Sequence, residues 1–172
     1  MKGRTMDWPD DVISLILAAF LGAAIGLERE LSGKSAGLRT NLLICLGAAI
    51  FTIISKRLAV VDEGSTTRIA AQIVTGVGFL GAGAVIQDRR GVHGLTTAAT
   101  IWLVASIGMA CGAGFRELAA ISTLIVIVVL AGLSKLAKPL ARYVQKHKAQ
   151  SIPDDQDYTG QERRQAEEKK AT

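Results

Sequence analysis

Five stretches of this 172-residue chain contain no Asp, Glu, Lys, Arg or His, and together they cover just over half of its length. The stretches are residues 12–27, 40–55, 69–87, 94–115 and 118–134. A helix on the surface of a soluble protein has one face in water and carries charge along its length. Almost every charge here lies between the stretches or after the last one. This pattern predicts an integral membrane protein, with the lipid bilayer as its main partner.

The stretches are 16 to 22 residues long, close to the roughly 20 apolar residues that a helix needs to cross a bilayer. Strands of a membrane barrel alternate in polarity, and none of these stretches alternates. Asp7, Asp10 and Asp11 precede the first stretch, where a signal peptide would carry positive charge. The predicted fold is therefore all-α: a polytopic membrane protein with five transmembrane helices.

Lysine and arginine are more numerous in the segments that face the cytoplasm if the C-terminus is inside. The positive-inside rule then predicts an N-terminus outside and a cytoplasmic C-terminus. Residues 1–137 form the predicted membrane domain. Cations and spaced apolar residues predict an interfacial segment after residue 137, and the dense charge beyond it predicts a disordered cytoplasmic tail, so that both lie within 138–172.

The net charge of +5 and the pI near 9.5 do not indicate a nucleic-acid partner, because the cations cluster at helix ends and in the tail. Cations in such places normally set topology and contact lipid. Cys45 and Cys111 both fall inside apolar stretches. We expect them to be small core residues and not a disulfide.

Small residues mark the faces on which membrane helices pack, because they let two backbones approach closely. Such faces are formed by Ala18, Gly22 and Gly26, by Gly78 and Ala82, and by Gly108 and Gly112. Packing within one bundle is the favoured interpretation, and a homodimer is the alternative.

Residues 76–81 read GVGFLG and match the dinucleotide-binding pattern letter for letter. The pattern also needs a preceding strand and an acidic residue about 20 positions later, and neither is found, so nucleotide binding is not expected. Four glycines weaken this helix: Gly76, Gly78, Gly81 and Gly83. Two interpretations stay open, namely close helix packing or a partly unwound segment that lines a polar cavity.

Several polar residues are predicted to meet at the cytoplasmic ends of the helices. They are Glu28, Arg29, Arg39, Thr40, Asn41, Asp88, Thr96, Thr97 and Thr100. Charges beside hydrocarbon are costly, so we expect pairing, with Glu28 against Arg39. The alternative is that these residues only anchor and cap the helices.

Metal binding and catalysis have little support in the sequence. Mg²⁺ would need about two carboxylates together with water, and Glu28 and Asp88 are the candidate ligands, although nothing in the sequence shows that they meet. We expect no resident cofactor. The chain has two histidines and no recognisable catalytic motif or triad, so it is not expected to be an enzyme and has no candidate catalytic residue.

Three long motifs follow one another: GLERELSGKSAGLRTN at 26–41, RIAAQIVTGVGFLGAGAVI at 68–86 and VHGLTTAATIWLVASIGMACGAG at 92–114. They closely resemble the membrane domain of the MgtC/SapB family, over residues 11–134 or so. Carried over onto this chain, the family's motif positions are Glu28, Arg29, Gly37, Arg39, Thr40, Asn41, Gly76, Gly78, Gly81, Gly83, Gly94, Leu95, Thr96, Thr97, Ala98 and Trp102.

The resemblance implies a five-helix protein of the bacterial inner membrane. The family is linked to growth at low Mg²⁺ and, in intracellular pathogens, to virulence through survival inside macrophages. Its best-known member is described as restraining the proton-translocating ATP synthase. Longer members carry a soluble C-terminal domain that resembles ACT folds, for which the tail of this chain is too short.

Two functional hypotheses follow. The leading one is a non-enzymatic membrane protein that acts in magnesium homeostasis or in adaptation to low Mg²⁺ by modulating another membrane protein, such as the ATP synthase. The alternative is a small transporter or channel for Mg²⁺ or another small solute.

Overall fold

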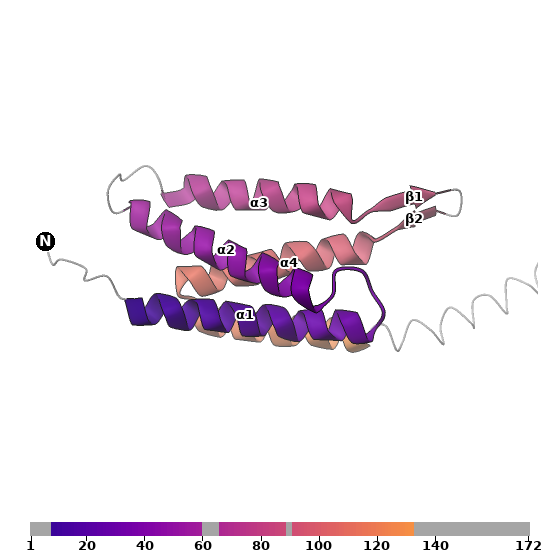
Figure 1. The fold of residues 1–172 in the computed structure, drawn as a ribbon, viewed down its shortest axis with the longest axis horizontal. Coiled ribbons are helices and arrows are strands. Elements are labelled where there is room, and N and C mark those ends of the chain that lie inside the picture. The colour runs from indigo at the N-terminus through magenta and orange to yellow at the C-terminus, as the bar shows by residue number, and fades with distance from the viewer. Residues whose placement is uncertain (1–7, 60–65, 89–90, 133–172) are drawn as a thin grey trace, which may run out of the picture. The chain divides into compact units, whose positions relative to one another are not determined.

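A computed structural model describes residues 8–59, 66–88 and 91–132 (Figure 1). Its elements are α1 (Trp8–Leu31), α2 (Leu38–Ala59), α3 (Thr66–Gly83), β1 (Ile86–Asp88), β2 (Gly91–His93) and α4 (Leu95–Ala113). A further helix occupies 116–132, and we call it the last helix. The predicted all-α fold is confirmed, with one short strand pair in addition. The segment and tail predicted at 138–172 lie outside the described residues.

Three helices are long and apolar enough to cross a membrane: α1 with 24 residues, Leu38–Leu58 of α2 with 21, and α4 with 19. A helix of 24 residues is about 36 Å long, and the hydrocarbon layer of a bilayer is about 30 Å thick. The apolar part of α3 is shorter and covers Ala71–Gly83. The chain is thus a membrane protein by the length and composition of its helices.

Residue size is distributed as expected for a protein whose solvent is lipid. Large apolar side chains such as Phe20, Leu43 and Leu124 are exposed on the outside of the helices. The interior is rich in small side chains, among them the two free cysteines Cys45 and Cys111, both fully buried. Lipid gives helices no hydrophobic reason to associate, so close packing of small residues has to hold them together.

The helices form one bundle in which α2 and α4 are central. Helix α4 packs against α1, α2 and α3, and α2 packs against α1, α3 and α4. In Figure 1, α1 and α3 accordingly lie on opposite sides of α2 and α4. The last helix joins the main core through Ala119 and Val126, which cluster with residues of α1 and α4 such as Ala18 and Val104.

Glycines make the closest helix contacts. A Cβ atom added at Gly22 of α1 would lie 2.6 Å from the Cβ of Cys45, and one at Gly108 of α4 would lie 2.1 Å from the carbonyl oxygen of Cys45. Helix α2 is therefore packed between α1 and α4 at distances that only glycine permits. Gly26 and Gly112 make the same kind of approach. An added Cβ would lie 2.7 Å from the Cα of Leu38 at Gly26, and 2.4 Å from the carbonyl oxygen of Ala49 at Gly112.

The predicted helix at 69–87 is wrong at its C-terminal end, because α3 stops at Gly83 and a β-hairpin follows. Strands β1 and β2 pair antiparallel, with Ile86 opposite His93. The chain returns through Gly94, whose φ is +89° and whose Cβ would lie 2.0 Å from the carbonyl oxygen of Ala84. Absence of charge could not reveal this boundary, since the β1 residues before Asp88 are also uncharged.

Candidate functional site

Polar side chains from three elements meet where α1 ends and where α2 and α4 begin. The connection between α1 and α2 is only residues 32–37 long, so it keeps the end of one helix beside the start of the next. The first turn of α4 reaches the same place after the β-hairpin, as shown by a hydrogen bond from Arg29 to Thr97 and by one between the hydroxyl groups of Ser35 and Thr97. We call Arg29, Ser35, Asn41 and Thr97 the polar cluster.

Arg29 is the buried cation of the polar cluster. Only 3% of its surface is exposed, and its Nη2 donates a hydrogen bond to Oγ1 of Thr97 over 2.9 Å. Its Nε is buried and has no hydrogen-bond partner among the described residues. No ion pair to Arg29 occurs in that part of the chain either, so its charge is held mainly by a neutral hydroxyl. A buried charge without a paired counter-ion is costly.

The hydroxyl groups of Ser35 and Thr97 lie 3.3 Å apart. Thr97 is buried, whereas Ser35 is exposed at the surface. The neighbouring threonines differ in their surroundings, since Thr96 is exposed and Thr100 is buried with its hydroxyl donating to the carbonyl of Thr96 over 2.8 Å. Of the four predicted threonines, which include the exposed Thr40, Thr97 alone shares a hydrogen bond with another predicted site residue through its side chain in the described structure.

Asn41 joins α2 to the connection that precedes it. Its side chain is fully buried, and Nδ2 donates to the carbonyl oxygens of Ala36 and, over 2.9 Å, of Gly37. Ala36 has a φ of +59°, a left-handed conformation that side chains rarely adopt. The amide of Asn41 therefore stabilises an otherwise strained turn. Its Oδ1 has no partner among the described residues.

The two carboxylates at the end of α1 serve local contacts. Glu28 accepts a hydrogen bond from the Ser32 hydroxyl over 2.8 Å through Oε1, and its Oε2 is buried without a partner in the described structure. Glu30 accepts from the backbone N–H of Leu38 over 2.8 Å and so caps α2. A Cβ at Gly37 would lie 2.7 Å from Oε2 of Glu30, so a larger residue there would displace this carboxylate from its capping position. The cap was not predictable from the sequence, because it joins residues of two different helices.

The predicted pairing of Glu28 with Arg39 is wrong. Arg39 and Thr40 are exposed on α2, and the inward position in this turn belongs to Asn41, which lies two residues further on and points to another side of the helix. The buried arginine is Arg29 instead. Its burial could have been anticipated, because it continues the stripe of Ala18, Gly22 and Ile25 along α1, all of which are buried. The side chain of Asp88 lies outside what the structure describes, so the candidate metal pair of Glu28 and Asp88 stays a prediction.

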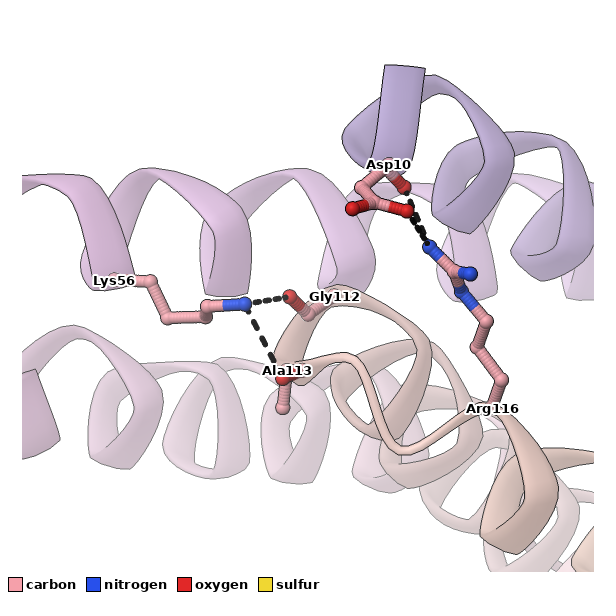
Figure 2. A network of polar contacts seen from close by, with 5 residues as sticks. All are labelled: Asp10, Lys56, Gly112, Ala113 and Arg116. Atoms are coloured by element: carbon pink, nitrogen blue, oxygen red, sulfur yellow. Dashed lines mark hydrogen bonds and ion pairs between the residues drawn. The ribbon is translucent and has the colours of Figure 1, made fainter. Parts of the chain in front are cut away.

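A second polar network lies at the other ends of these helices, opposite to the polar cluster (Figure 2). Asp10 of α1 pairs with Arg116 of the last helix over 2.8 Å, and Lys56 of α2 donates to the carbonyl oxygens of Gly112 and Ala113 over 3.4 and 3.2 Å. These lysine contacts satisfy carbonyl groups at the C-terminus of α4, which have no partner within their own helix.

Arg57 completes this network. It pairs with Asp11 and lies 4.6 Å from the centre of the Trp8 ring. In the sequence, the charges at this end indicate only topology, and nothing in their positions predicts that they connect helix ends.

The glycines of α3 differ from those of α1 and α4. The helix is continuous from Thr66 to Gly83, so no unwound segment interrupts it. A Cβ at Gly81 would lie 3.7 Å from that of Ala98, an ordinary contact, whereas at Gly76, Gly78 and Gly83 it would meet nothing within 4 Å. No described residue therefore packs against these three glycines, and Gly76 borders the cavity between α2 and α3.

A cavity of about 510 Å³ lies between α2 and α3. Its lining is apolar except for Gln72, and Gly47 and Gly76 widen it by having no side chains. The cavity is separate from the polar cluster, because no cluster residue lines it. Its chemistry suits an apolar group and not a hydrated cation.

Comparison with known proteins gives the family context. The MgtC family profile matches residues 15–138. The chain is 48% identical over 125 residues to a putative magnesium transporter, YhiD, of Escherichia coli K12, covering 69% of this chain and 58% of that protein. It is 47% identical over 123 residues to protein MgtC of Brucella abortus, covering 72% and 51%, and 46% identical over 127 residues to protein MgtC of Salmonella typhimurium, covering 74% and 53%. The chain thus spans only about half the length of these relatives. No solved structure matches it significantly.

Proposed function

Because the chain belongs to the MgtC family, we propose that it is a non-enzymatic protein of the bacterial inner membrane that acts in magnesium homeostasis or in adaptation to low Mg²⁺. It does so by binding and modulating another membrane protein. The name of the Escherichia coli relative supports the link to magnesium. The family resemblance makes the proton-translocating ATP synthase the first partner to test.

The observation that carries this proposal is the outward face of α3. Gly76, Gly78 and Gly83 meet nothing within 4 Å, and Phe79 between them is 81% exposed. At about 100° per residue around the helix, Gly76 and Gly83 lie on one side of Phe79 and Gly78 on the other. Grooves of small residues beside a large side chain are what a second membrane helix needs for close packing.

Helix energetics support the same conclusion. A glycine inside a helix costs about 1 kcal/mol relative to alanine. Gly22 and Gly108 offset this cost through contacts that a Cβ would prevent. Gly76 and Gly78 make no such contact within the described chain, so a helix of another protein is the occupant that accounts for them.

The test is to replace Gly76 and Gly78 with leucine, separately and together. Both positions have open space, so the variants are expected to insert and fold like the wild type. The proposal predicts that they lose co-purification of the partner, with the ATP synthase probed first, and fail to restore growth at low Mg²⁺ to a deletion strain. A matched control is Ala120→Leu, which enlarges an exposed small residue of the last helix.

Three results would contradict this assignment. If Gly76→Leu together with Gly78→Leu left partner capture and low-Mg²⁺ growth unchanged, the face of α3 would not be the binding surface. If Ala120→Leu impaired both as strongly, the effect would reflect crowding in the membrane in general. Recovery of only a second copy of the chain would replace the modulator with a homodimer.

A transporter for Mg²⁺ or another small solute is the second candidate. It is favoured by two buried oxygens without partners among the described residues, Oε2 of Glu28 and Oδ1 of Asn41. Carboxylate and amide oxygens are the ligands that hard cations prefer.

Flux of Mg²⁺ into liposomes that contain the purified chain tests the transporter, with Glu28→Gln alongside. Transport predicts saturable flux that the substitution abolishes while the protein still inserts. Absence of flux from correctly inserted wild-type protein, or equal flux from Glu28→Gln, would remove Glu28 from any transport path.

A further inference from the structure

The first turn of α4 and the buried guanidinium of Arg29 form a group of hydrogen-bond donors without an anion. Gly94 occupies the N-cap position of α4, and no side chain caps the helix there. The first backbone N–H groups of a helix have no partner within it, and they carry a partial positive charge. Such a helix end is suited to bind an anion.

Arg29 supplies the independent second observation. Its side chain is 97% buried, reaches the first turn of α4 through the hydrogen bond to Thr97, and retains an Nε without a partner in the described part of the chain. Of the nearby carboxylates, Glu30 accepts from the N–H of Leu38 and Glu28 accepts from Ser32 through Oε1. Oε2 of Glu28 is buried without a hydrogen-bond partner among the described residues, and neither carboxylate forms an ion pair with Arg29 there. The positive charge of Arg29 therefore has the charge of Glu28 nearby but no directly bound counter-ion among the described residues.

The hydroxyl groups of Thr97 and Ser35 connect the buried Arg29 to the surface. Oγ1 of Thr97 accepts from Arg29, and it lies 3.3 Å from the hydroxyl oxygen of Ser35, where either hydroxyl can be the donor. A buried cation that is linked through hydroxyl groups to the surface, beside a helix N-terminus without a side-chain cap, favours a ligand that only accepts hydrogen bonds, which is an oxyanion and not a metal ion.

The depth of the site indicates which oxyanion it meets. Arg29 lies 21 residues after Trp8 in α1, a distance of about 32 Å along the helix axis. Tryptophan is enriched at the boundary of a hydrocarbon layer about 30 Å thick. With Trp8 at one boundary, Arg29 lies at the level of the opposite headgroups, where phosphate is abundant. Arginine also matches the geometry of phosphate oxygens.

We propose that Arg29, Thr97, Ser35 and the uncapped N-terminus of α4 form a phosphate-binding site at the membrane surface. Its ligand is a phosphate group, supplied either by a lipid headgroup or by a free phosphate. The site is distinct from the α3 face, and it does not depend on which membrane protein the chain modulates.

The test uses the full chain in a phosphate-free maltoside detergent. Native mass spectrometry compares binding of phosphatidylglycerol with that of a glucosyl diacylglycerol with the same acyl chains, which lacks phosphate. In a second arm, inorganic phosphate is titrated against chloride at constant ionic strength while the midpoint of thermal unfolding is measured. Preference for the phospholipid in the first arm assigns a lipid source, and stabilisation by inorganic phosphate alone assigns a soluble one.

Three variants make the result specific. Thr97→Val keeps the shape of the side chain, and Ser35→Ala removes an exposed hydroxyl. Each is expected to weaken phosphate binding about tenfold, the effect of losing one hydrogen bond to a charged group. Arg39→Gln removes an exposed cation at the same end of the bundle and is expected to bind like the wild type.

The proposal is overturned if the wild type prefers neither the phospholipid nor inorganic phosphate. It is also overturned if Thr97→Val and Ser35→Ala both bind as well as the wild type, or if Arg39→Gln weakens binding as much as they do. Since the readout is binding, it does not change with the outcome of the growth and partner experiments.

Discussion

Nη2 of Arg29 and Oγ1 of Thr97 lie 2.9 Å apart, and their hydrogen bond joins residues 68 positions apart in the sequence. It connects the end of α1 to the first turn of α4, so one buried contact holds together helices whose own sequences give no sign of the pairing. Because a charged group is desolvated there, the contact matters for stability as well as for the proposed phosphate site.

Thr97→Val is expected to lower the free energy of unfolding by about 1.5–3 kcal/mol, the range for a hydrogen bond to a charged group. The substitution leaves Nη2 of Arg29 buried without its acceptor. Reversible unfolding in mixed micelles with increasing SDS measures the effect. Thr96→Val is the matched control, because that side chain is exposed, and a loss of equal size in the control would refute the assignment.

Gly108→Ala is expected to lower the free energy of unfolding by about 2 kcal/mol or more, or to prevent folding. The added methyl group would lie 2.1 Å from the carbonyl oxygen of Cys45. Overpacking of a tight contact typically costs 1–3 kcal/mol, and clashes with backbone exceed that range. Gly47→Ala on α2 should be nearly neutral, since nothing lies within 4 Å. Thermal unfolding in detergent compares the two variants, and similar midpoints would contradict the packing described for α2 and α4.

Gly94→Ala is expected to disrupt the passage from the β-hairpin into α4. The residue has a φ of +89°, and a Cβ would lie 2.0 Å from the carbonyl oxygen of Ala84. Gly91→Ala is the informative comparison, because its φ is also positive, at +132°, but its surroundings are open. Limited proteolysis should cut the hairpin of Gly94→Ala several times faster than that of Gly91→Ala. Equal rates would mean that backbone strain alone, and not the contact with Ala84, decides the effect.

The ion pair of Asp10 with Arg116 is expected to contribute only about 0.2–1 kcal/mol to the free energy of unfolding. Both side chains are substantially exposed, so solvent screens their charges. A double-mutant cycle with Asp10→Asn and Arg116→Gln measures the coupling. Raising the salt concentration from 0.05 to about 0.5 M should reduce it, since exposed charges are screened within a few ångströms at high ionic strength. A coupling above 2 kcal/mol that did not depend on salt would show that the pair is shielded from water.

The positions of α1, α2 and α4 were predictable because absence of charge over a bilayer's thickness is a direct consequence of the solvent. The β-hairpin was not, since Ala84–Gln87 is as free of charge as the helix before it. A strand pair outside the hydrocarbon can contain the same residues as a helix inside it. The signal that was present is Gly94 together with Gly83, two glycines that bracket the hairpin.

Within the candidate site, residue types were predictable and their directions were not. A charge beside an apolar stretch can face either the bundle or the outside, and Glu28, Arg29 and Arg39 have the same kind of position in the sequence. The rotation of each helix decides between them, and it is set by contacts with helices far away in the chain. Arg29 could have been assigned to the interior by extending the small-residue stripe of α1, whereas the cap of α2 by Glu30 needed the folded connection.

The small interior of the bundle also provides its own reporter. Cys45 and Cys111 are the only two cysteines in the chain, and neither has any surface accessible to solvent. A maleimide can reach either thiol only when α2 or α4 moves away from its neighbours. The rate of alkylation therefore measures how often the native bundle opens, in intact cells and without an engineered label.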